Sequence, residues 1–357
     1  MLTRLACIGA MLVSATAYGQ CAPVQLIQNG GFELPLIANN SAEANVTPTG
    51  WTWTPVVGGF LFRGAVGPIW PLAPQESQFL DIGNAGPYFL QQVITVPHRQ
   101  IVRMQWRASA AVGAVTSPYD MRVRRVSDGS SRFTVREDAA GPYPPGEFWD
   151  VVGFETEFEP GQYIVEFQAR GVASGSDTLI DDVRIEALPG PAIRQMSASG
   201  STFPGESITF AALIYGVPPF TTQWERRLGG SGPWIPLTDG FVPGMGVVFG
   251  STTTVLDLSD LVPGGGLQEF RCVVASACGV GPDFLINPII DVPRCDSIDF
   301  NRNGVFPEDQ DVMDFFNVLA GADCPGCRDI DFNNNGVFPE DQDVVDFFTV
   351  LAGGACG

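Results

Sequence analysis

The chain has 357 residues, enough for two or three globular domains, and its formal net charge is −20. Such an acidic chain has no basic stripe to neutralise phosphates, so a nucleic-acid partner is not expected. Short alternating segments broken by Gly and Pro indicate a mainly β fold, made of two sandwiches and a small helical C-terminal part. Beyond the N-terminus no apolar stretch is long enough to span a membrane.

Residues 1–19 have the pattern of a secretory signal peptide. Arg4 supplies the positive start, residues 5–13 form the apolar core, and Ala17-Tyr18-Gly19 is a small-x-small cleavage site. We therefore expect an exported protein, either secreted or held at the cell surface. Export is compatible with disulfide bonds, and seven cysteines remain after cleavage.

Residues 20–188 are predicted to form the first β-sandwich. Alternating segments at 91–96, 101–108, 121–126 and 162–170 have the length and pattern of strands, and they are separated by Gly and Pro. Short strands at this spacing are typical of sandwiches and jelly rolls.

Three motifs resemble the galactose-binding-like jelly rolls of many carbohydrate-binding modules. They are LIQNGGFELP near the start, GWTW at Gly50, and TLIDDVRIEAL at the end. The resemblance implies that the Gly-Phe-Glu turn and the Asp-Asp-Val strand approach each other and hold a structural calcium ion. Glu33 and Asp182 are then the candidate ligands. The alternative is that these acids only cap turns.

Strand parity also predicts a polar sheet face. Met104 and Trp106 point into the core, so the alternate residues point outward. Arginine forks suit sugar hydroxyls and carboxylates, and loop aromatics can stack on sugar rings. The candidate glycan contacts are Arg103, Arg107, Arg122, Arg124, Trp51, Trp53, Trp70 and Tyr88. The alternative is a solvated face over core tryptophans, without a polysaccharide ligand.

Residues 191–293 are predicted to form a second, immunoglobulin-like sandwich after the LPGPA linker at 188–192. Trp224 is expected in its core, and EFRCVV in a late strand. Because Ala212 occupies the position of the usual partner cysteine, we expect Cys272 to pair with Cys278. We interpret this domain as a spacer.

Residues 295–357 contain one unit twice. DFNRNGVFPEDQDVMDFFNVLAG begins at Asp299 and DFNNNGVFPEDQDVVDFFTVLAG at Asp331. The opening D-x-N-x-N-G is typical of EF-hand-type calcium loops, which supply oxygen ligands from alternate residues. The predicted ligands are Asp299, Asn301, Asn303, Val305 and Asp311 in the first copy, and Asp331, Asn333, Asn335, Val337 and Asp343 in the second.

Each loop is expected to be one residue longer than an EF-hand loop. Gln310 stands where the closing acid of an EF-hand belongs, and Asp311 follows one residue later. A helix should follow, because Val312, Phe315, Phe316 and Leu319 recur at helical spacing on one apolar face.

This doubled loop–helix unit resembles a dockerin, in its cysteine-bracketed, planctomycete-type form. The resemblance implies calcium as the bound cofactor and a cohesin-like module as partner, docked on a helix face that either copy can present. The exposed residues of that face nearly match between copies: Asp309, Gln310, Asp314 and Asn317 against Asp341, Gln342, Asp346 and Thr349. The alternative is a calcium-stabilised surface or matrix protein without a docking partner.

The repeat also predicts two disulfides in the tail. The symmetry of the units favours Cys295–Cys324 and Cys327–Cys356, one bridge for each copy. A zinc site at Cys324 and Cys327 lacks the second cysteine pair that zinc fingers have. Cys21 has no predicted partner.

We do not expect an enzyme. A nucleophile–histidine mechanism would depend on His98 alone, and no nucleophile-elbow, P-loop or zincin motif is present. A glycoside hydrolase needs only two carboxylates, but nothing in the sequence pairs the candidate glutamates.

Overall fold

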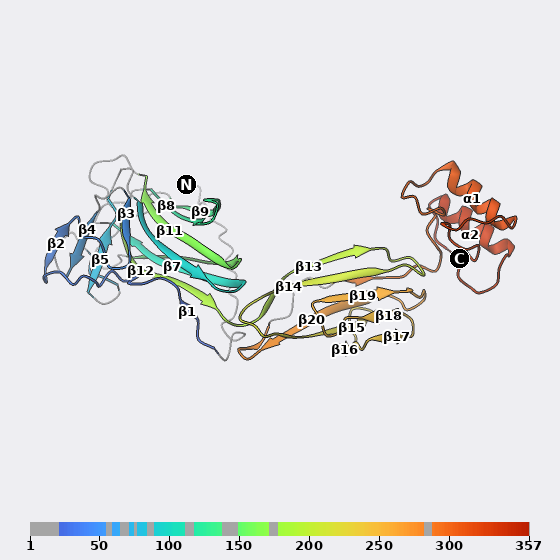
Figure 1. Ribbon diagram of the computed structural model, residues 1–357, viewed down its shortest axis with the longest axis horizontal. Coiled ribbons are helices and arrows are strands. Elements are labelled where there is room, and N and C mark those ends of the chain that lie inside the picture. Colours follow the sequence, from blue (N-terminus) through green and yellow to red (C-terminus); the bar gives the residue numbers. More distant parts are fainter. Residues whose placement is uncertain are drawn as a thin grey trace, which may run out of the picture. The chain divides into compact units, whose positions relative to one another are not determined.

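The structure is a computed structural model that describes residues 21–54, 59–64, 71–74, 77–83, 89–110, 118–137, 149–170, 178–281 and 288–356 (Figure 1). The chain forms two compact units. The main boundary lies between Gly190 and Pro191, inside the LPGPA segment, and residues 215–218 and 277–279 belong to the first unit.

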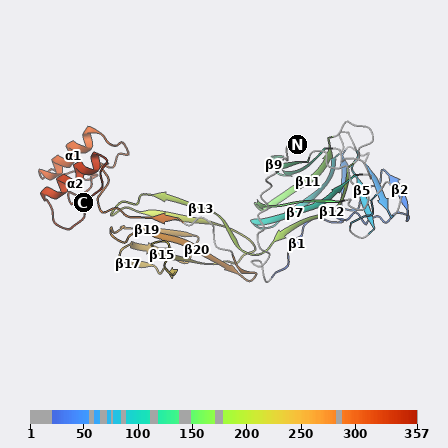
Figure 2. The same cartoon turned by 180° about the vertical axis from the view of Figure 1, so that it is seen from behind.

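The first unit contains two antiparallel sheets. The strand orders are β10-β7-β12-β5-β4-β2, with β1 also pairing with β12, and β3-β6-β11-β8-β9. Figure 2 shows β7 beside β12 in the larger sheet. The strands are β1 Val24–Gln25, β2 Ser41–Ala44, β3 Thr52–Thr54, β4 Phe60–Arg63, β5 Gln78–Asp81, β6 Phe89–Val96, β7 Gln100–Ser109, β8 Tyr119–Arg125, β9 Ser131–Glu137, β10 Asp150–Phe158, β11 Gly161–Ala169 and β12 Leu179–Leu188.

Alternation along these strands builds the core of the first unit. Trp106 of β7 contacts Phe167 of β11 with ring centroids 5.6 Å apart, so the two sheets face each other as a sandwich. The side chains predicted to point inward from 101–108, 121–126 and 162–170 are buried, which confirms the parity. Each buried apolar side chain of this size contributes about 1.5–3 kcal/mol by its removal from water.

The second unit contains another pair of antiparallel sheets. Their orders are β13-β14-β19-β18-β17 and β16-β15-β20-β21, with β22 pairing with β20. Trp224 is fully buried against Phe210, as predicted, and Phe210 also contacts Phe270 from the opposite sheet. The strands are β13 Ala192–Gly200, β14 Ile208–Tyr215, β15 Thr221–Leu228, β16 Ile235–Pro236, β17 Gly240–Val242, β18 Gly246–Phe249, β19 Val255–Ser259, β20 Gln268–Ser276, β21 Gly279–Val280 and β22 Ile289–Ile290.

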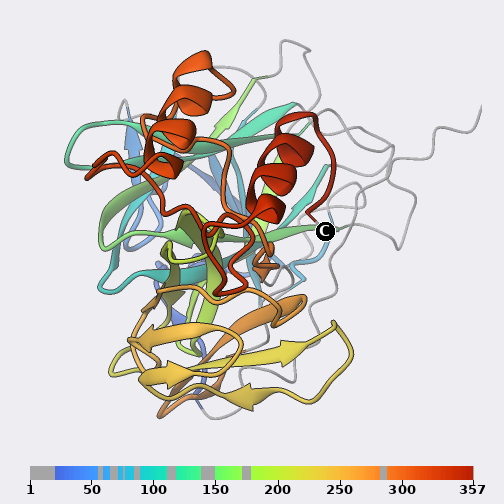
Figure 3. The same cartoon turned by 90° about the vertical axis from the view of Figure 1, so that its right-hand side faces the viewer.

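Two helices follow the two loops of the repeat, as predicted. They are α1 Asp309–Leu319 and α2 Asp341–Leu351, drawn in orange and red in Figure 3. At 11 residues each, neither helix of the described chain is long and apolar enough to cross a membrane. A mainly β chain with a small helical C-terminal part is therefore confirmed.

The tail has a small core of its own around two stacked rings. Phe315 and Phe347 are fully buried, with centroids 4.1 Å apart, and Phe300 and Phe332 close the core. Phe316, predicted on the same face as Phe315, is instead 43% exposed. The prediction was wrong because neighbouring helical positions lie about 100° apart, and this core is too small to cover both rings.

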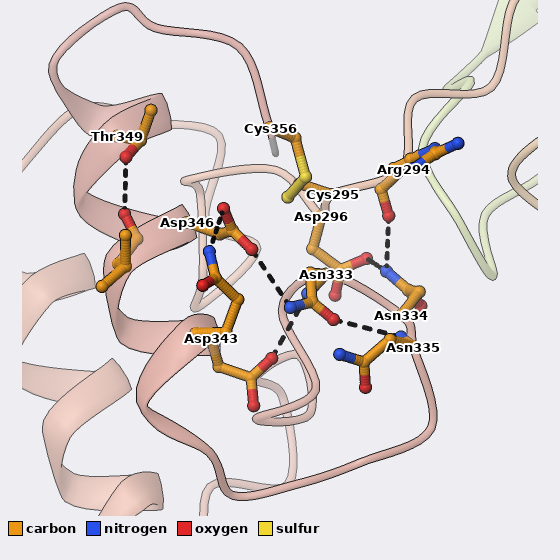
Figure 4. Close-up of a disulfide and its surroundings, with 12 residues drawn as sticks. Arg294, Cys295, Asp296, Asn333, Asn334, Asn335, Asp343, Asp346, Thr349 and Cys356 are labelled. Atoms are coloured by element: carbon orange, nitrogen blue, oxygen red, sulfur yellow. Dashed lines mark hydrogen bonds between the residues drawn. A yellow bond between two sulfur atoms is a disulfide. The ribbon is translucent and has the colours of Figure 1, made fainter.

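The structure pairs the cysteines differently from the sequence prediction. The bridges are Cys21–Cys278, Cys324–Cys327 and Cys295–Cys356, and the last is shown in Figure 4. The predicted Cys295–Cys324, Cys327–Cys356 and Cys272–Cys278 pairs are therefore wrong. The Cys295–Cys356 bridge joins the two ends of the tail, whereas each predicted bridge would have lain within one repeat. Cys272 is free, and burial raises the pKa of its thiol to about 12.

Loss of the Cys295–Cys356 bridge is expected to destabilise the tail more than loss of Cys324–Cys327. A bridge restricts the unfolded chain, and the loop-closure relation gives about 4 kcal/mol for a separation of 61 residues and about 2 kcal/mol for a separation of 3. Urea unfolding of C295S/C356S and of C324S/C327S, followed by helical circular dichroism, measures the difference. Equal losses of unfolding free energy would contradict the observed pairing.

Candidate functional site

The first residue of each loop organises a tight backbone turn. Asp299 accepts hydrogen bonds from the backbone N–H groups of Asn303 at 3.1 Å and Gly304 at 3.0 Å. Asp331 does the same for Asn335 at 3.0 Å and Gly336 at 2.8 Å. The glycines have φ values of +81° and +80°, a left-handed conformation that a side chain disfavours.

The two amides of each loop continue the turn. The side-chain oxygen of Asn301 accepts from Asn303 N at 3.1 Å, and that of Asn303 accepts from Val305 N at 2.7 Å. The second loop repeats both contacts through Asn333 and Asn335. Alternate polar side chains thus face the inside of each loop, as the D-x-N-x-N-G pattern predicts.

The late acid closes each loop. Asp311 is fully buried, and its carboxylate accepts from Phe300 N at 2.9 Å and from Glu308 N at 3.3 Å, so it joins the start of the loop to the start of α1. Asp311 thus closes the loop although the loop is one residue longer than that of an EF-hand. Asp343 likewise accepts from Glu340 N at 3.2 Å. In these contacts the closing acid accepts hydrogen bonds from backbone N–H groups. Its role as a metal ligand stays a prediction.

Four acids that the sequence analysis did not choose as ligands also lie at the loops. Glu308 accepts a hydrogen bond from the Asn303 amide, and Asp314 accepts one from the Asn301 amide at 3.2 Å. In the second loop Glu340 accepts from Asn335, and Asp346 accepts from Asn333 at 3.0 Å. Asp314 and Asp346 could have been found from the sequence, because a residue three positions after the closing acid lies on the same helix face.

Asp346 was predicted on the exposed docking face, and that prediction is wrong. It is 3% exposed and lies against the Cys295–Cys356 bridge (Figure 4). One carboxylate oxygen and the two sulfurs lie within 4.8 Å of one another. Because both sulfurs are joined in a disulfide, they offer no thiolate to a metal ion.

Electrostatic repulsion is concentrated in both loops. Burial, and then the nearby negative charge of Asp299, raise the pKa of Asp311 above its usual range. Burial raises the pKa of Asp343 too, with Asp331 and Glu340 as the like-charged neighbours. Such a set of hard oxygen donors fits calcium, which takes six to eight oxygens and would offset the shared negative charge.

The candidate aromatic contacts of the first unit do not form a glycan platform in the described residues. Trp51 and Trp53 are each 4% exposed, and their indole N–H groups donate to Asn29 O and Val46 O. Both are core residues, so their predicted role in sugar stacking is wrong. Trp70 and Tyr88 lie outside the described residues.

The candidate arginines lie on two different sheets. Arg103 and Arg107 are on β7, where Arg103 pairs with Glu155 at 2.9 Å. Arg122 and Arg124 are on β8 of the five-stranded sheet. A single arginine face was predicted because parity gives the direction of a side chain within its strand but not the sheet to which the strand belongs. The predicted four-arginine face is therefore wrong, and the four residues form two separate pairs, one on β7 and one on β8.

Glu33 and Asp182 have different partners in the structure, and their role as shared calcium ligands stays a prediction. The predicted approach of the two segments is present, since Val183 N donates to Gly30 O at 3.0 Å. Glu33, however, accepts from Ser77 and Gln78, and Asp182 pairs with two arginines. Two guanidinium groups already offset the charge of the Asp182 carboxylate.

Solved structures similar to part of this chain include several carbohydrate-binding modules. A family 61 module in complex with β-1,4-galactotriose has 14% identity and a TM-score of 0.32, with 45% of this chain and 97% of that chain covered. The xylan-binding CBM22-1 domain from Paenibacillus barcinonensis has 13% identity and a TM-score of 0.30, with 43% and 98% covered. The K2 cleaved adhesin domain of Lys-gingipain has 14% identity and a TM-score of 0.31, with 46% and 99% covered.

No protein-family model and no curated protein matches the chain. The structural scores are too low to transfer a ligand, so binding functions are argued from the residues of this chain.

Proposed function

We propose that residues 295–357 bind two calcium ions and thereby dock the chain to a cohesin-like protein module. One observation carries the proposal: the two loops repeat the same backbone and side-chain hydrogen bonds, residue for residue. Two copies of one loop geometry, each lined by acids and amides, are expected of two equivalent cation sites.

The ligands in each loop would be side-chain oxygens and one backbone carbonyl. In the first loop these are Asp299, Asn301, Asn303, Val305 and Asp311, and Glu308 is close enough to the amides to add a further oxygen. Calcium would supply the positive charge that these carboxylates share. Bound calcium would also hold the loop in the turn from which the helix starts.

The docking surface would lie on the exposed side of the helix pair. Phe316 and Phe348, one from each repeat, are 43% and 39% exposed, and their ring centroids are 5.9 Å apart. Met313 and Val345 are each 53% exposed beside them. An apolar patch with equal contributions from both copies would accept a partner in either of two orientations related by the repeat.

Two docking orientations predict a specific pattern of mutant effects. Gln310→Ala and Gln342→Ala are each expected to weaken binding less than threefold, because the partner can still dock on the other copy. The double variant should lower the affinity about tenfold or more, which is about 1.4 kcal/mol of binding free energy. Calorimetry with purified cohesin modules, with calcium and with chelator, measures this.

Asp323→Ala, an exposed acid between the repeats, is the control and should bind like the parent chain. Single and double variants with equal affinity would argue against two orientations. No calcium-dependent binding to any cohesin module would favour a calcium-stabilised surface or matrix protein.

For the first unit we propose carbohydrate binding on the outer face of the five-stranded sheet. Thr52, Gln91, Glu166 and Arg122 are paired across four neighbouring strands in one row. A row of hydroxyl, amide, carboxylate and guanidinium groups matches the hydrogen-bonding groups of a sugar chain. A glycan array followed by a hydrolysis assay separates binding from catalysis, and absence of binding to every glycan would reject this part of the proposal.

Both activities require an exported protein. The three disulfides of the described residues support an oxidising compartment, because such bridges rarely persist in reducing ones. Sequencing of the mature N-terminus tests whether residues 1–19 are removed.

A further inference from the structure

Four arginines gather on the outer face of the five-stranded sheet of the first unit. Arg122 and Arg124 lie on β8, Arg136 lies on β9, and Arg170 directly follows β11. These three strands are neighbours in the order β11-β8-β9. We call this set the arginine cluster.

The cluster is fixed by two buried carboxylates. Asp120 is fully buried and pairs with Arg170 at 2.5 Å, Arg122 at 2.7 Å and Arg136 at 3.8 Å. Glu166, 2% exposed, pairs with Arg124 at 2.7 Å. The two buried carboxylates hold Arg122, Arg124 and Arg170 in place, so these three side chains have little entropy left to lose when a ligand binds.

The cluster brings four guanidinium groups, all at least partly exposed, onto one sheet face. Among the described residues, the four guanidinium groups share the carboxylates of Asp120 and Glu166, and Arg170 also donates to Glu137 O at 3.4 Å, in a chain whose formal net charge is −20. Each guanidinium has about five N–H donors, so the cluster has about twenty donors in all. The side chains of Arg122, Arg124, Arg136 and Arg170 are 30%, 37%, 73% and 30% exposed.

The cluster continues into the polar row already described. Glu166 is paired in register with Gln91 of β6, and Gln91 with Thr52 of β3. A depression of about 290 Å³ beside Gln91 is lined by Gln28, Thr52 and Gln92 among others. From β8 to β3 the row crosses three strand spacings, about 14 Å in all. A ligand with several linked polar units fits this extent better than a single sugar.

Next to the cluster lies an aromatic ring. The guanidinium of Arg122 stands 5.8 Å from the centre of the Phe89 ring, which is partly exposed on the same sheet. An apolar ring beside fixed cations suits a ligand that has both C–H faces and anionic groups. A neutral polymer would offer no charged acceptor to these exposed guanidinium groups.

We propose that this face binds an anionic polysaccharide, whose carboxylate or sulfate groups are held by the arginine cluster. The inference rests on the proposed carbohydrate binding and names the class of ligand. Carboxylates and sulfates both accept paired N–H donors from guanidinium groups. Nucleic acid is a poorer fit, because a cluster of only four arginines releases few counterions and the polar row beside it offers hydroxyl and amide groups that match sugar hydroxyls.

The test uses the full chain in calcium-free buffer, which prevents calcium from bridging the polymer to the acidic tail. Polygalacturonate is compared with its methyl ester, dextran sulfate with dextran, and duplex DNA is added as a separate polyanion. The charged member of one carbohydrate pair is expected to bind at least about tenfold more tightly than the uncharged one, because only it can form charge-assisted contacts. The pair that responds distinguishes carboxylate from sulfate.

Matched variants locate the binding on the sheet. Arg136→Gln removes the most exposed arginine and leaves Asp120 with two partners, so folding should be retained, and thermal unfolding checks this. It is expected to weaken binding about threefold to tenfold, the effect of one charge-assisted contact. Arg103→Gln, with the same charge change on the other sheet, should leave the affinity unchanged.

Each other outcome is decisive. Equal binding of charged and uncharged polymers rejects the anionic class but keeps the carbohydrate proposal. Failure to bind any polymer rejects both. Equal losses in the Arg136 and Arg103 variants, or equally tight binding of DNA, would mean unspecific charge attraction and would overturn the site.

Discussion

Calcium titrated into the full chain is expected to fill two sites, and Asp299→Ala and Asp331→Ala should each remove one of them. Each aspartate orders two backbone N–H groups of its loop and adds a carboxylate to the ligand set. Its loss removes both the turn and one negative charge. Calorimetry should therefore report two ions for the parent chain, one for each single variant and none for the double variant.

Calcium should also stabilise the tail. A ligand that binds only the folded state at one hundred times its dissociation constant adds about 2.7 kcal/mol per site. Thermal unfolding followed by helical circular dichroism reports this, since both helices of the described residues belong to the tail. Asp309→Ala and Asp341→Ala are matched controls, because these acids are exposed at the helix starts. Two ions still bound by the double variant would reject the assigned ligands.

Phe315→Ala is expected to unfold the tail, whereas Phe316→Ala should leave it folded. Phe315 is fully buried and stacks on Phe347 at 4.1 Å, and removal of such a ring costs about 3–5 kcal/mol. A module this small rarely has more than about 3–5 kcal/mol of stability from its core. Without bound calcium, the helical signal at room temperature should therefore collapse in the first variant.

The neighbouring ring is an internal control of the same residue type. Phe316 is 43% exposed, so its truncation should cost about 1 kcal/mol or less. Urea unfolding of both variants, in the presence of calcium, compares the two losses. A similar loss of unfolding free energy in both would contradict the assignment of Phe315 to the core and Phe316 to the surface.

The sequence predicts well what depends on local pattern. Residues 101–108 alternate between apolar and polar, and strand β7 has the predicted inward face. In the tail, the repeat of Asp-x-Asn-x-Asn-Gly before an apolar helical pattern predicts a loop and a helix twice, and both copies have them. These features depend on neighbours within about ten residues, so a single sequence contains the information.

Features that depend on distant segments are predicted poorly. Arg103 and Arg122 both occupy outward-facing positions of their strands. The two strands belong to different sheets, and no local pattern specifies that choice. Trp53 could have been assigned to the core, since Thr52 and Thr54 on either side point outward. The repeat symmetry suggested one bridge per copy, whereas Cys295 and Cys356 pair because the two ends of the tail meet.

The bond between Cys21 and Cys278 links the order of synthesis to the final structure. The two residues are 257 positions apart, and at ribosomal rates of about 5–20 residues per second the first waits roughly 10–50 seconds for the second. Cys272, only six positions before the proper partner, is synthesised at almost the same time and is a rival at the end of that wait. Once the second unit has folded, the burial of Cys272 keeps its thiol away from Cys21 and leaves Cys278 as the available partner.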